Sequence, residues 1–362
     1  MGSAEPLVSV ITPTFNHESL IGECIQSVLN QSYANWEMII VDDGSTDATA
    51  AVVMSFDDPR VKLFQQKNKG PNHLGETYNF ALSKASGELV AILEGDDFWP
   101  AEKLATQVQD FQDEAVVLSW GLARIVTFDG HELSITPPKL PPHHGCVNDP
   151  VGRATYTMLQ PDWMTFAFPV TVVMRKATLD KIGGFIQAPY FRTVDLSTFL
   201  ALGLEGRWAF RDEVCGIWRR HPDSITRNEL PTIFNNAYRL CAEFVRANRA
   251  KLGMSKLQVA WLARQWGSFQ YERCLLLGRM FAADHKFKES DAFFRRAGIY
   301  PLSFKSRVLL GIARGLVGLR LSPEVVFKLA GKSDWQAQYN RDLDPIVSLD
   351  MDPEDFGTES FA

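Results

Sequence analysis

Residues 87–100 read G-E-L-V-A-I-L-E-G-D-D-F-W-P, an apolar run that ends in a group of acidic residues. The run from Leu89 to Leu93 has the length and composition of a buried strand. Glu94, Asp96 and Asp97 follow it directly. Burying several carboxylates together is costly unless a cation or hydrogen-bond donors compensate their charge. The segment therefore predicts a strand whose end carries a polar, cation-binding site.

Strand-type runs alternate with helix-type patterns up to about residue 125. The apolar residues of the helix-type patterns recur at helical spacing, as Ile21, Ile25 and Val28 do. This alternation predicts an α/β fold with a mostly parallel, Rossmann-like sheet flanked by helices. Ligands of such sheets bind beyond the carboxyl ends of the strands. Three segments fall there, at residues 13–16, 42–45 and 94–97.

Some polar residues stand where helices are expected to begin, which offers a purely structural explanation for them. Ser19 is expected to cap the first helix, and a longer helix is expected over residues 100–111. Asp96 or Asp97 would then cap that longer helix instead of binding a metal. A cap needs only one carboxylate, so the acidic group favours the metal.

The pattern changes after Ser224, where helical periodicity takes over to about Lys332. The sequence therefore predicts an α/β domain at 1–226 and a mainly helical region at 227–333. Residues 334–362 are acidic and poor in apolar side chains, which predicts a flexible tail. A segment rich in proline and histidine, residues 137–150, is expected to form a mobile loop.

The charge and the cysteine content limit the classes to which the protein can belong. The chain has 43 acidic and 37 basic residues, a formal net charge of −6, which argues against a nucleic-acid partner. Its 5 cysteines are scattered without a metal-binding or disulfide spacing, as in a reduced cytoplasmic protein. The opening residues do not resemble a signal peptide. Arg314 interrupts the most apolar C-terminal stretch, so no transmembrane segment is predicted.

Six motifs together resemble those of family 2 glycosyltransferases with the GT-A fold, in order and in spacing. The resemblance extends over about residues 7–226 and does not include the C-terminal third. The motifs are S-V-I-T-P-T-F-N (9–16), V-D-D-G-S-T-D (41–47), the segment at 87–100, I-G-G-F (182–185), T-V-D-L (193–196) and R-R-H-P-D-S-I (219–225).

The resemblance implies an inverting transfer of a sugar from a nucleotide-sugar, with UDP as the commonest nucleotide, to an acceptor hydroxyl. It also implies a divalent cation, Mn²⁺ or Mg²⁺, and a glycan or lipid-linked glycan as acceptor. The expected setting is polysaccharide biosynthesis for the cell envelope, in the cytoplasm or at the inner face of the membrane. Basic residues between Lys305 and Lys332 would allow peripheral membrane contact, but Arg307 and Arg314 share one helix face while Lys305 and Arg320 lie opposite them, so a solvated helix face is the favoured explanation.

By the same resemblance, the ends of the first and second strands hold the nucleotide. A polar turn between strand and helix is the alternative explanation for Asp42 and Asp43. Two residues depart from the family pattern: Glu94 replaces an aspartate, and Tyr78 replaces an arginine. The implied donor-binding residues are Pro13, Thr14, Asn16, Asp42, Asp43, Ser45, Lys67, Glu94, Asp96, Arg219 and Arg220, with Lys69 an alternative to Lys67 for the diphosphate.

The resemblance gives Asp96, Asp97 and His221 as metal ligands, although a lone histidine is also common as a structural residue. Asp195 matches the catalytic base, which takes the acceptor proton as the hydroxyl attacks the anomeric carbon. The alternative role for Asp195 is to cap the helix that begins at Leu196.

Other functions fit the residues less well. A dinucleotide oxidoreductase needs a G-x-G-x-x-G turn after the first strand, and this chain has P-T-F-N there. The remaining alternative is a non-catalytic nucleotide-sugar or carbohydrate-binding relative of the same fold, which the change at Glu94 permits.

Overall fold

The structure is a computed structural model that describes residues 5–140, 151–162, 166–221, 225–283, 285–300 and 304–320. The predicted acidic tail, residues 334–362, lies outside the described residues, as does the loop at 137–150 beyond residue 140. The chain divides into two compact units, Met1–Ile225 and Thr226–Ala362. Each unit is described below by itself.

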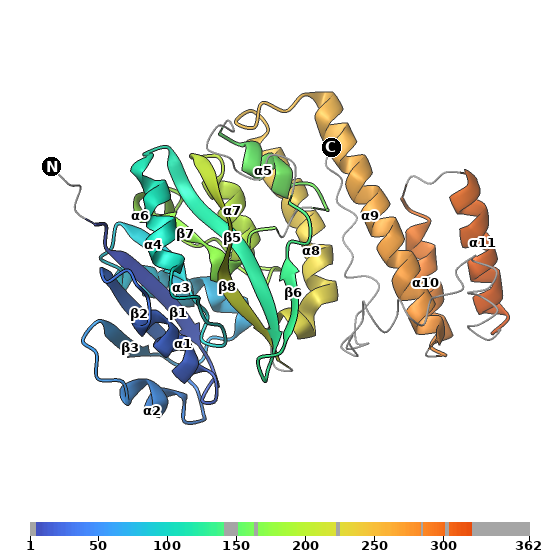
Figure 1. Cartoon of the computed structure of the whole chain (residues 1–362). Helices are drawn as coiled ribbons and strands as arrows, with labels where there is room; N and C mark the ends of the chain where they lie inside the picture. The colour runs from blue at the N-terminus through green and yellow to red at the C-terminus, as the bar shows by residue number, and fades with distance from the viewer. Residues whose placement is uncertain are drawn as a thin grey trace. The chain divides into compact units, whose positions relative to one another are not determined.

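The first unit is built on one eight-stranded sheet with the order β3-β2-β1-β4-β7-β5-β6, and β8 pairs with β5 (Figure 1). The pairs β1–β2, β1–β4, β2–β3 and β5–β8 are parallel, and β7 is antiparallel to β4 and β5. The strands are β1 (Val8–Thr14), β2 (Trp36–Asp42), β3 (Val61–Gln65), β4 (Leu89–Ile92), β5 (Val116–Thr127), β6 (Glu132–Thr136), β7 (Val173–Arg175) and β8 (Arg207–Arg220).

Short helices alternate with these strands, so the predicted α/β class with a flanked, mostly parallel sheet is confirmed. Val8 and Val10 of β1 pack in one apolar core with Ile21 and Ile25 of the first helix. The helices are α1 (Ile21–Leu29), α2 (Thr49–Met54), α3 (Leu74–Lys84), α4 (Lys103–Gln107), α5 (Arg153–Met158), α6 (Lys176–Lys181) and α7 (Asp195–Leu202), with 3₁₀ turns η1 (Pro71–His73), η2 (Val108–Gln112) and η3 (Pro169–Thr171).

Two helix boundaries differ from the sequence-based expectation. Helix α1 begins two residues after Ser19, and no side chain caps it. The helix expected over residues 100–111 is the five-residue α4 followed by the 3₁₀ turn η2. The cap position of α4 is Glu102 and carries no side-chain cap, so neither Asp96 nor Asp97 has the capping role.

The described residues of the second unit form helices joined by short connections, with no strand among them. It contains α8 (Ile225–Asn248), α9 (Lys256–Ala283), α10 (Phe287–Ala297) and α11 (Phe304–Gly318). Phe281 of α9 stacks on Phe293 of α10 at a centroid distance of 5.2 Å, and Leu310 of α11 belongs to the same core. None of the described helices has the length and apolarity that crossing a membrane requires.

Candidate active site at the strand ends

The carboxyl ends of β1, β2 and β4 meet at one edge of the sheet. Thr14 pairs with Asp42 at the ends of β1 and β2. The amide of Asp43 donates to the carbonyl of Thr14 at 2.9 Å, and the amide of Gly95 donates to the carbonyl of Pro13 at 3.1 Å. The register of the parallel strands therefore brings the three predicted loop segments together.

The loop after β2 uses both of its aspartates as hydrogen-bond acceptors. Buried Asp42 accepts from the backbone amide of Ser45 at 2.9 Å. Asp43 accepts from the Gln66 side chain at 2.7 Å and from the backbone amide of Lys69 at 3.1 Å. These bonds hold residues 66–70 against the end of β2.

Asn16 and Ser45 fasten the loops after β1 and β2 to each other. The amide of Asn16 donates to the Ser45 hydroxyl at 2.9 Å, and the Asn16 side-chain oxygen accepts from the amide of Thr46 at 2.8 Å. Asn16 adopts a left-handed conformation with φ of 53°, which asparagine tolerates better than most residues. The predicted nucleotide-binding residues of these two loops thus form one connected surface.

Three carboxylates crowd the end of β4. Glu94, Asp96 and Asp97 each place one oxygen within 4.8 Å of the others. Burial and the charge of Asp96 raise the pKa of Glu94 to about 7. Burial and the same neighbouring charge raise the pKa of Asp97 well above its usual range. The cluster therefore favours a positive charge beside it.

Two hydrogen bonds hold this cluster in place. The Tyr78 hydroxyl donates to Glu94 Oε1 at 2.6 Å from a fully buried position on α3. The amide of Arg219 donates to Asp97 Oδ1 at 2.8 Å. Tyr78 and Glu94, the two residues expected from the sequence to depart from the family pattern, are therefore paired directly.

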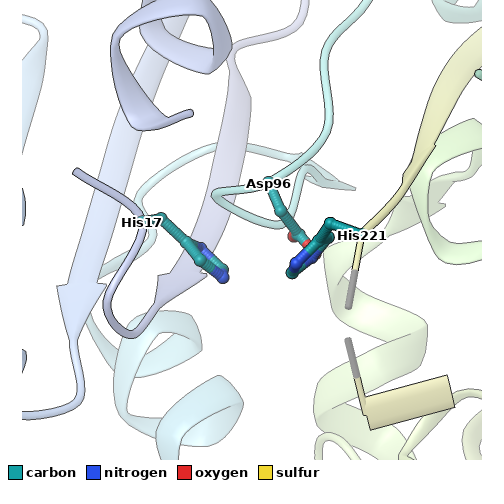
Figure 2. A group of neighbouring side chains, drawn as sticks. All are labelled: His17, Asp96 and His221. Atoms are coloured by element: carbon teal, nitrogen blue, oxygen red, sulfur yellow. The ribbon is translucent and has the colours of Figure 1, made fainter. Parts of the chain in front are cut away.

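Asp96 points toward two histidines that come from distant parts of the chain (Figure 2). His221 Nε2, at the end of β8, lies 2.9 Å from Asp96 Oδ2. His17, from the loop between β1 and α1, also contributes a ligand atom within 4.8 Å of the others. Burial raises the pKa of Asp96, but the hydrogen bond from His221 and the charges of both histidines outweigh it and lower this pKa.

His17 was not among the residues predicted from the sequence. The segment at the end of the first strand was identified there, but the prediction stopped at Asn16. The signal was available, because His17 is the next residue after a segment already expected at the carboxyl edge.

Asp195 is the first residue of α7, and its Oδ1 is buried without a hydrogen-bond partner among the described residues. The cap position of α7 is Val194, so the capping alternative for Asp195 finds no support. The charge of Asp195 contributes to the raised pKa of Glu94 and of Tyr78. Asp195 therefore lies at the same site as the carboxylate cluster.

The basic residues predicted to bind the donor differ in what they contact. Arg219 is buried, and its guanidinium contacts Glu23 and the Asp96 carbonyl. Arg220 is exposed and lies over the Trp218 ring at 5.5 Å. Lys69 pairs with Glu76 at 2.8 Å, whereas Lys67 is exposed. Arg220 and Lys67 are the more accessible cations for an anionic ligand.

The donor set fits a divalent cation chemically. Carboxylate oxygens suit Mg²⁺ and Mn²⁺, and imidazole nitrogens suit transition metals better than Mg²⁺. Asp96 is shared by both groups of candidate ligands, the three carboxylates and the set His17, Asp96 and His221. A metal at this edge would neutralise the crowded acids.

Comparisons with known proteins agree with this architecture. Residues 9–183 match the family model described as "Glycosyl transferase family 2". TuaG of Bacillus subtilis (strain 168), a glycosyltransferase named for teichuronic acid biosynthesis, is 32% identical over 237 residues, which cover 63% of this chain and 85% of TuaG.

A second relative matches over a shorter part. The Escherichia coli UDP-Glc:alpha-D-GlcNAc-diphosphoundecaprenol beta-1,3-glucosyltransferase WfgD is 39% identical over 120 residues, 33% of this chain and 47% of WfgD. Among solved structures, S. aureus TarS 1-349 in complex with UDP-GlcNAc superimposes with a TM-score of 0.54 at 20% identity, covering 91% of this chain and 92% of TarS 1-349. That likeness shows the same GT-A fold.

Proposed function

This chain belongs to glycosyl transferase family 2, and from that premise we propose that it is an inverting, metal-assisted glycosyltransferase. Its donor is a nucleotide-sugar, with UDP as the nucleotide, and its acceptor is a hydroxyl of a glycan or lipid-linked glycan. The observation that carries the proposal is the buried, unpartnered oxygen of Asp195 beside the carboxylate cluster. WfgD, whose name specifies a UDP-sugar donor and a diphosphoundecaprenol-linked acceptor, supports the substrate classes.

The loops after β1 and β2 hold the nucleotide in this proposal. Pro13 and Thr14 end a buried strand, and Asn16 and Ser45 close the surface beside them. Asp42 or Asp43 offers a carboxylate oxygen to a base imide or a ribose hydroxyl, which is a charge-assisted hydrogen bond. These residues recognise the donor by its neutral polar groups.

The end of β4 holds the charged part of the donor. Asp96 and His221 are the metal ligands, and Asp97 supports them from a buried position. These residues would hold a Mn²⁺ or Mg²⁺ ion, which would supply positive charge to offset the negative charge that develops on the leaving diphosphate. Arg220 and Lys67 add positive charge, while Glu94 borders the ribose.

Asp195 takes the acceptor proton during the displacement. Its Oδ1 has no partner among the described residues, so it can accept a hydrogen bond from an acceptor hydroxyl. Exclusion of water around a buried carboxylate strengthens that bond. A single displacement of this kind inverts the anomeric configuration without a covalent intermediate.

We expect Asp195→Asn to lower the turnover of sugar transfer by about 100-fold or more, with little change in donor affinity. Asparagine keeps the shape of the side chain but cannot take the proton. Turnover is measured by release of UDP from a panel of UDP-sugars with acceptor, and donor affinity by calorimetry.

Asp180→Asn is the matched control, because Asp180 is a helical aspartate that pairs with Lys176 in the i,i+4 position. It is expected to behave like the unmodified protein. Near-normal turnover in Asp195→Asn would remove Asp195 from the mechanism. Donor binding without any transfer in the unmodified protein would favour the non-catalytic alternative.

The proposal also places the second unit at the inner, cytoplasmic face of a membrane, where a lipid-linked acceptor lies. The exposed fractions of Val308, Leu309, Ile312 and Leu319 on and just after α11 are between 42% and 72%. At 100° per residue Val308, Leu309 and Ile312 share one arc of α11. Residues 304–320 include basic side chains and no acidic one, which suits anionic lipid headgroups.

We therefore expect the protein to float with vesicles that contain phosphatidylglycerol and not with vesicles of phosphatidylcholine alone. Ile312→Asp should abolish flotation, because it places a charge in the middle of the apolar arc. Equal recovery of the protein away from both kinds of vesicle would contradict the peripheral contact.

A further inference from the structure

We propose that His17 is a third protein ligand of the divalent cation, so that two imidazoles and the Asp96 carboxylate hold the metal before a nucleotide arrives. This inference rests on the proposed function, because it concerns the same metal site. Its basis is the convergence of three ligand atoms, one from each residue, within 4.8 Å of one another. In Figure 2 the His17 ring points across a gap toward the Asp96 carboxylate and the His221 ring, which lie together.

The backbone of His17 is fixed on both sides. Its amide donates to the Thr49 hydroxyl at 2.8 Å. Its carbonyl accepts from the amides of Leu20 and Ile21, each at 2.9 Å. These bonds hold the backbone of His17 at the entry to α1.

The ring of His17 is also oriented. Its Nδ1 lies 3.1 Å from the hydroxyl of buried Thr14. When that hydroxyl accepts from Nδ1–H, the lone pair of the neutral ring is on Nε2, the nitrogen then suited to a metal. A hydrogen bond to the second ring nitrogen is a usual feature of metal-binding histidines. Thr14 would supply it here.

Gly95 provides the space for this arrangement. A Cβ at residue 95 would lie 2.5 Å from Thr14 Oγ1 and 3.0 Å from His17 Nδ1. Any other residue would push apart the ring and the hydroxyl that orients it. The glycine within E-G-D-D thus lets the loop after β1 reach the acidic loop.

The two imidazoles lie close to each other at the proposed metal position. The rings of His17 and His221 are perpendicular, with centroids 6.0 Å apart. His221 Nε2 already contacts Asp96 Oδ2 at 2.9 Å. Their separation leaves room for a cation between the nitrogens, with Asp96 as the shared carboxylate.

This ligand set determines which metals bind well. Mg²⁺ prefers oxygen ligands and keeps several waters, whereas Mn²⁺ and Co²⁺ accept imidazole nitrogen more readily. Two imidazoles therefore favour Mn²⁺ and Co²⁺ over Mg²⁺. The preference should be present in the protein alone, without nucleotide.

The test is the affinity of the full chain for Mn²⁺ without nucleotide, measured by electron paramagnetic resonance of the free ion. We expect His17→Ala to weaken Mn²⁺ binding about tenfold or more, and to reduce the preference for Mn²⁺ over Mg²⁺. In spin-echo spectra, bound Mn²⁺ should show two imidazole nitrogens in the unmodified protein and one in His17→Ala. His17→Asn is a second variant, should alanine at this helix entry prevent folding.

His73→Ala is the matched control, because His73 is an exposed histidine that pairs with Glu76 at 2.8 Å; it should leave Mn²⁺ affinity unchanged. Unchanged Mn²⁺ affinity and two imidazole nitrogens in His17→Ala would overturn the inference, and weaker UDP binding in that variant would then assign His17 to the diphosphate. Asp96→Ala tests the metal site itself, independently of the role of His17. If this variant also binds Mn²⁺ normally, the proposed metal site itself is wrong, and not only the role of His17.

Discussion

Two pairs of adjacent aspartates follow buried parallel strands in this protein, and their surroundings differ. Asp42 and Asp43 accept hydrogen bonds from backbone amides and glutamine side chains, all from residues 45 to 70. Asp96 and Asp97 instead share their space with Glu94 and receive bonds from the distant end of β8.

The difference shows that two acidic pairs at the ends of strands can be suited to different kinds of ligand. Around Asp43, the amides of Lys69 and Gly70 supply partial positive charge that is built into the backbone. Burial and the neighbouring carboxylates raise the pKa of the Asp97 carboxyl. The first pair is suited to recognising neutral polar groups of a ligand, and the second to binding a cation.

The largest effect that would test this comparison is on metal-dependent donor binding. We expect Asp96→Asn to weaken UDP binding in Mn²⁺ by about 100-fold, to the level that the unmodified protein shows in EDTA. Asparagine retains the size of the side chain but removes the charge that a divalent cation requires. Calorimetric titration of UDP in each buffer gives both values.

Asp43→Asn is the matching substitution in the first pair. It should weaken UDP binding by a similar factor in Mn²⁺ and in EDTA, because Asp43 contacts no proposed metal ligand. If the two variants lose affinity with the same dependence on metal, the division between the two pairs is wrong.

A smaller effect is expected on stability. Tyr78→Phe removes the hydroxyl that donates to Glu94 Oε1 at 2.6 Å, and should lower the free energy of unfolding in EDTA by about 1–2 kcal/mol. Urea unfolding measures this change in the free energy of unfolding. Gln65→Met removes one of several donors to Asp42 and should cost less than about 0.5 kcal/mol. Equal losses in these two variants would mean that Glu94 depends no more on its tyrosine donor than Asp42 depends on one of its several donors.

The α/β alternation, the sheet and its polar edge were predictable from the sequence, because apolar strands and helical spacing are local patterns. The actual structure of residues 100–111, where one longer helix was expected, was not predictable. Asp110 lies within that stretch, and its carboxylate accepts from Ser119 at 2.7 Å and from Arg211 at 2.6 Å. These tertiary contacts accompany the change from α4 to a 3₁₀ turn, and no local propensity encodes them.

Within the site, the strand-end residues were predictable, but their partners were not. Arg219 was expected to hold the diphosphate, and the structure places its guanidinium against Glu23 of α1. Tyr78 was noted as a departure, but its bond to Glu94 needs the packing of α3 on the sheet. His17 was missed because Asp96 and His221, the residues that give it a role, are distant in sequence.

The contact between Asp96 and His221 joins residues 125 positions apart. At a synthesis rate of about 5–20 residues per second, the acidic loop exists for roughly 6–25 s before His221 is made. During that interval the crowded carboxylates lack the imidazole of His221. Pairing of β8 with β5 must also close a long loop of the chain. In the proposed metal site, tight Mn²⁺ binding would require a chain that has folded through residue 221, and would serve as a conformational assay for nascent or truncated chains.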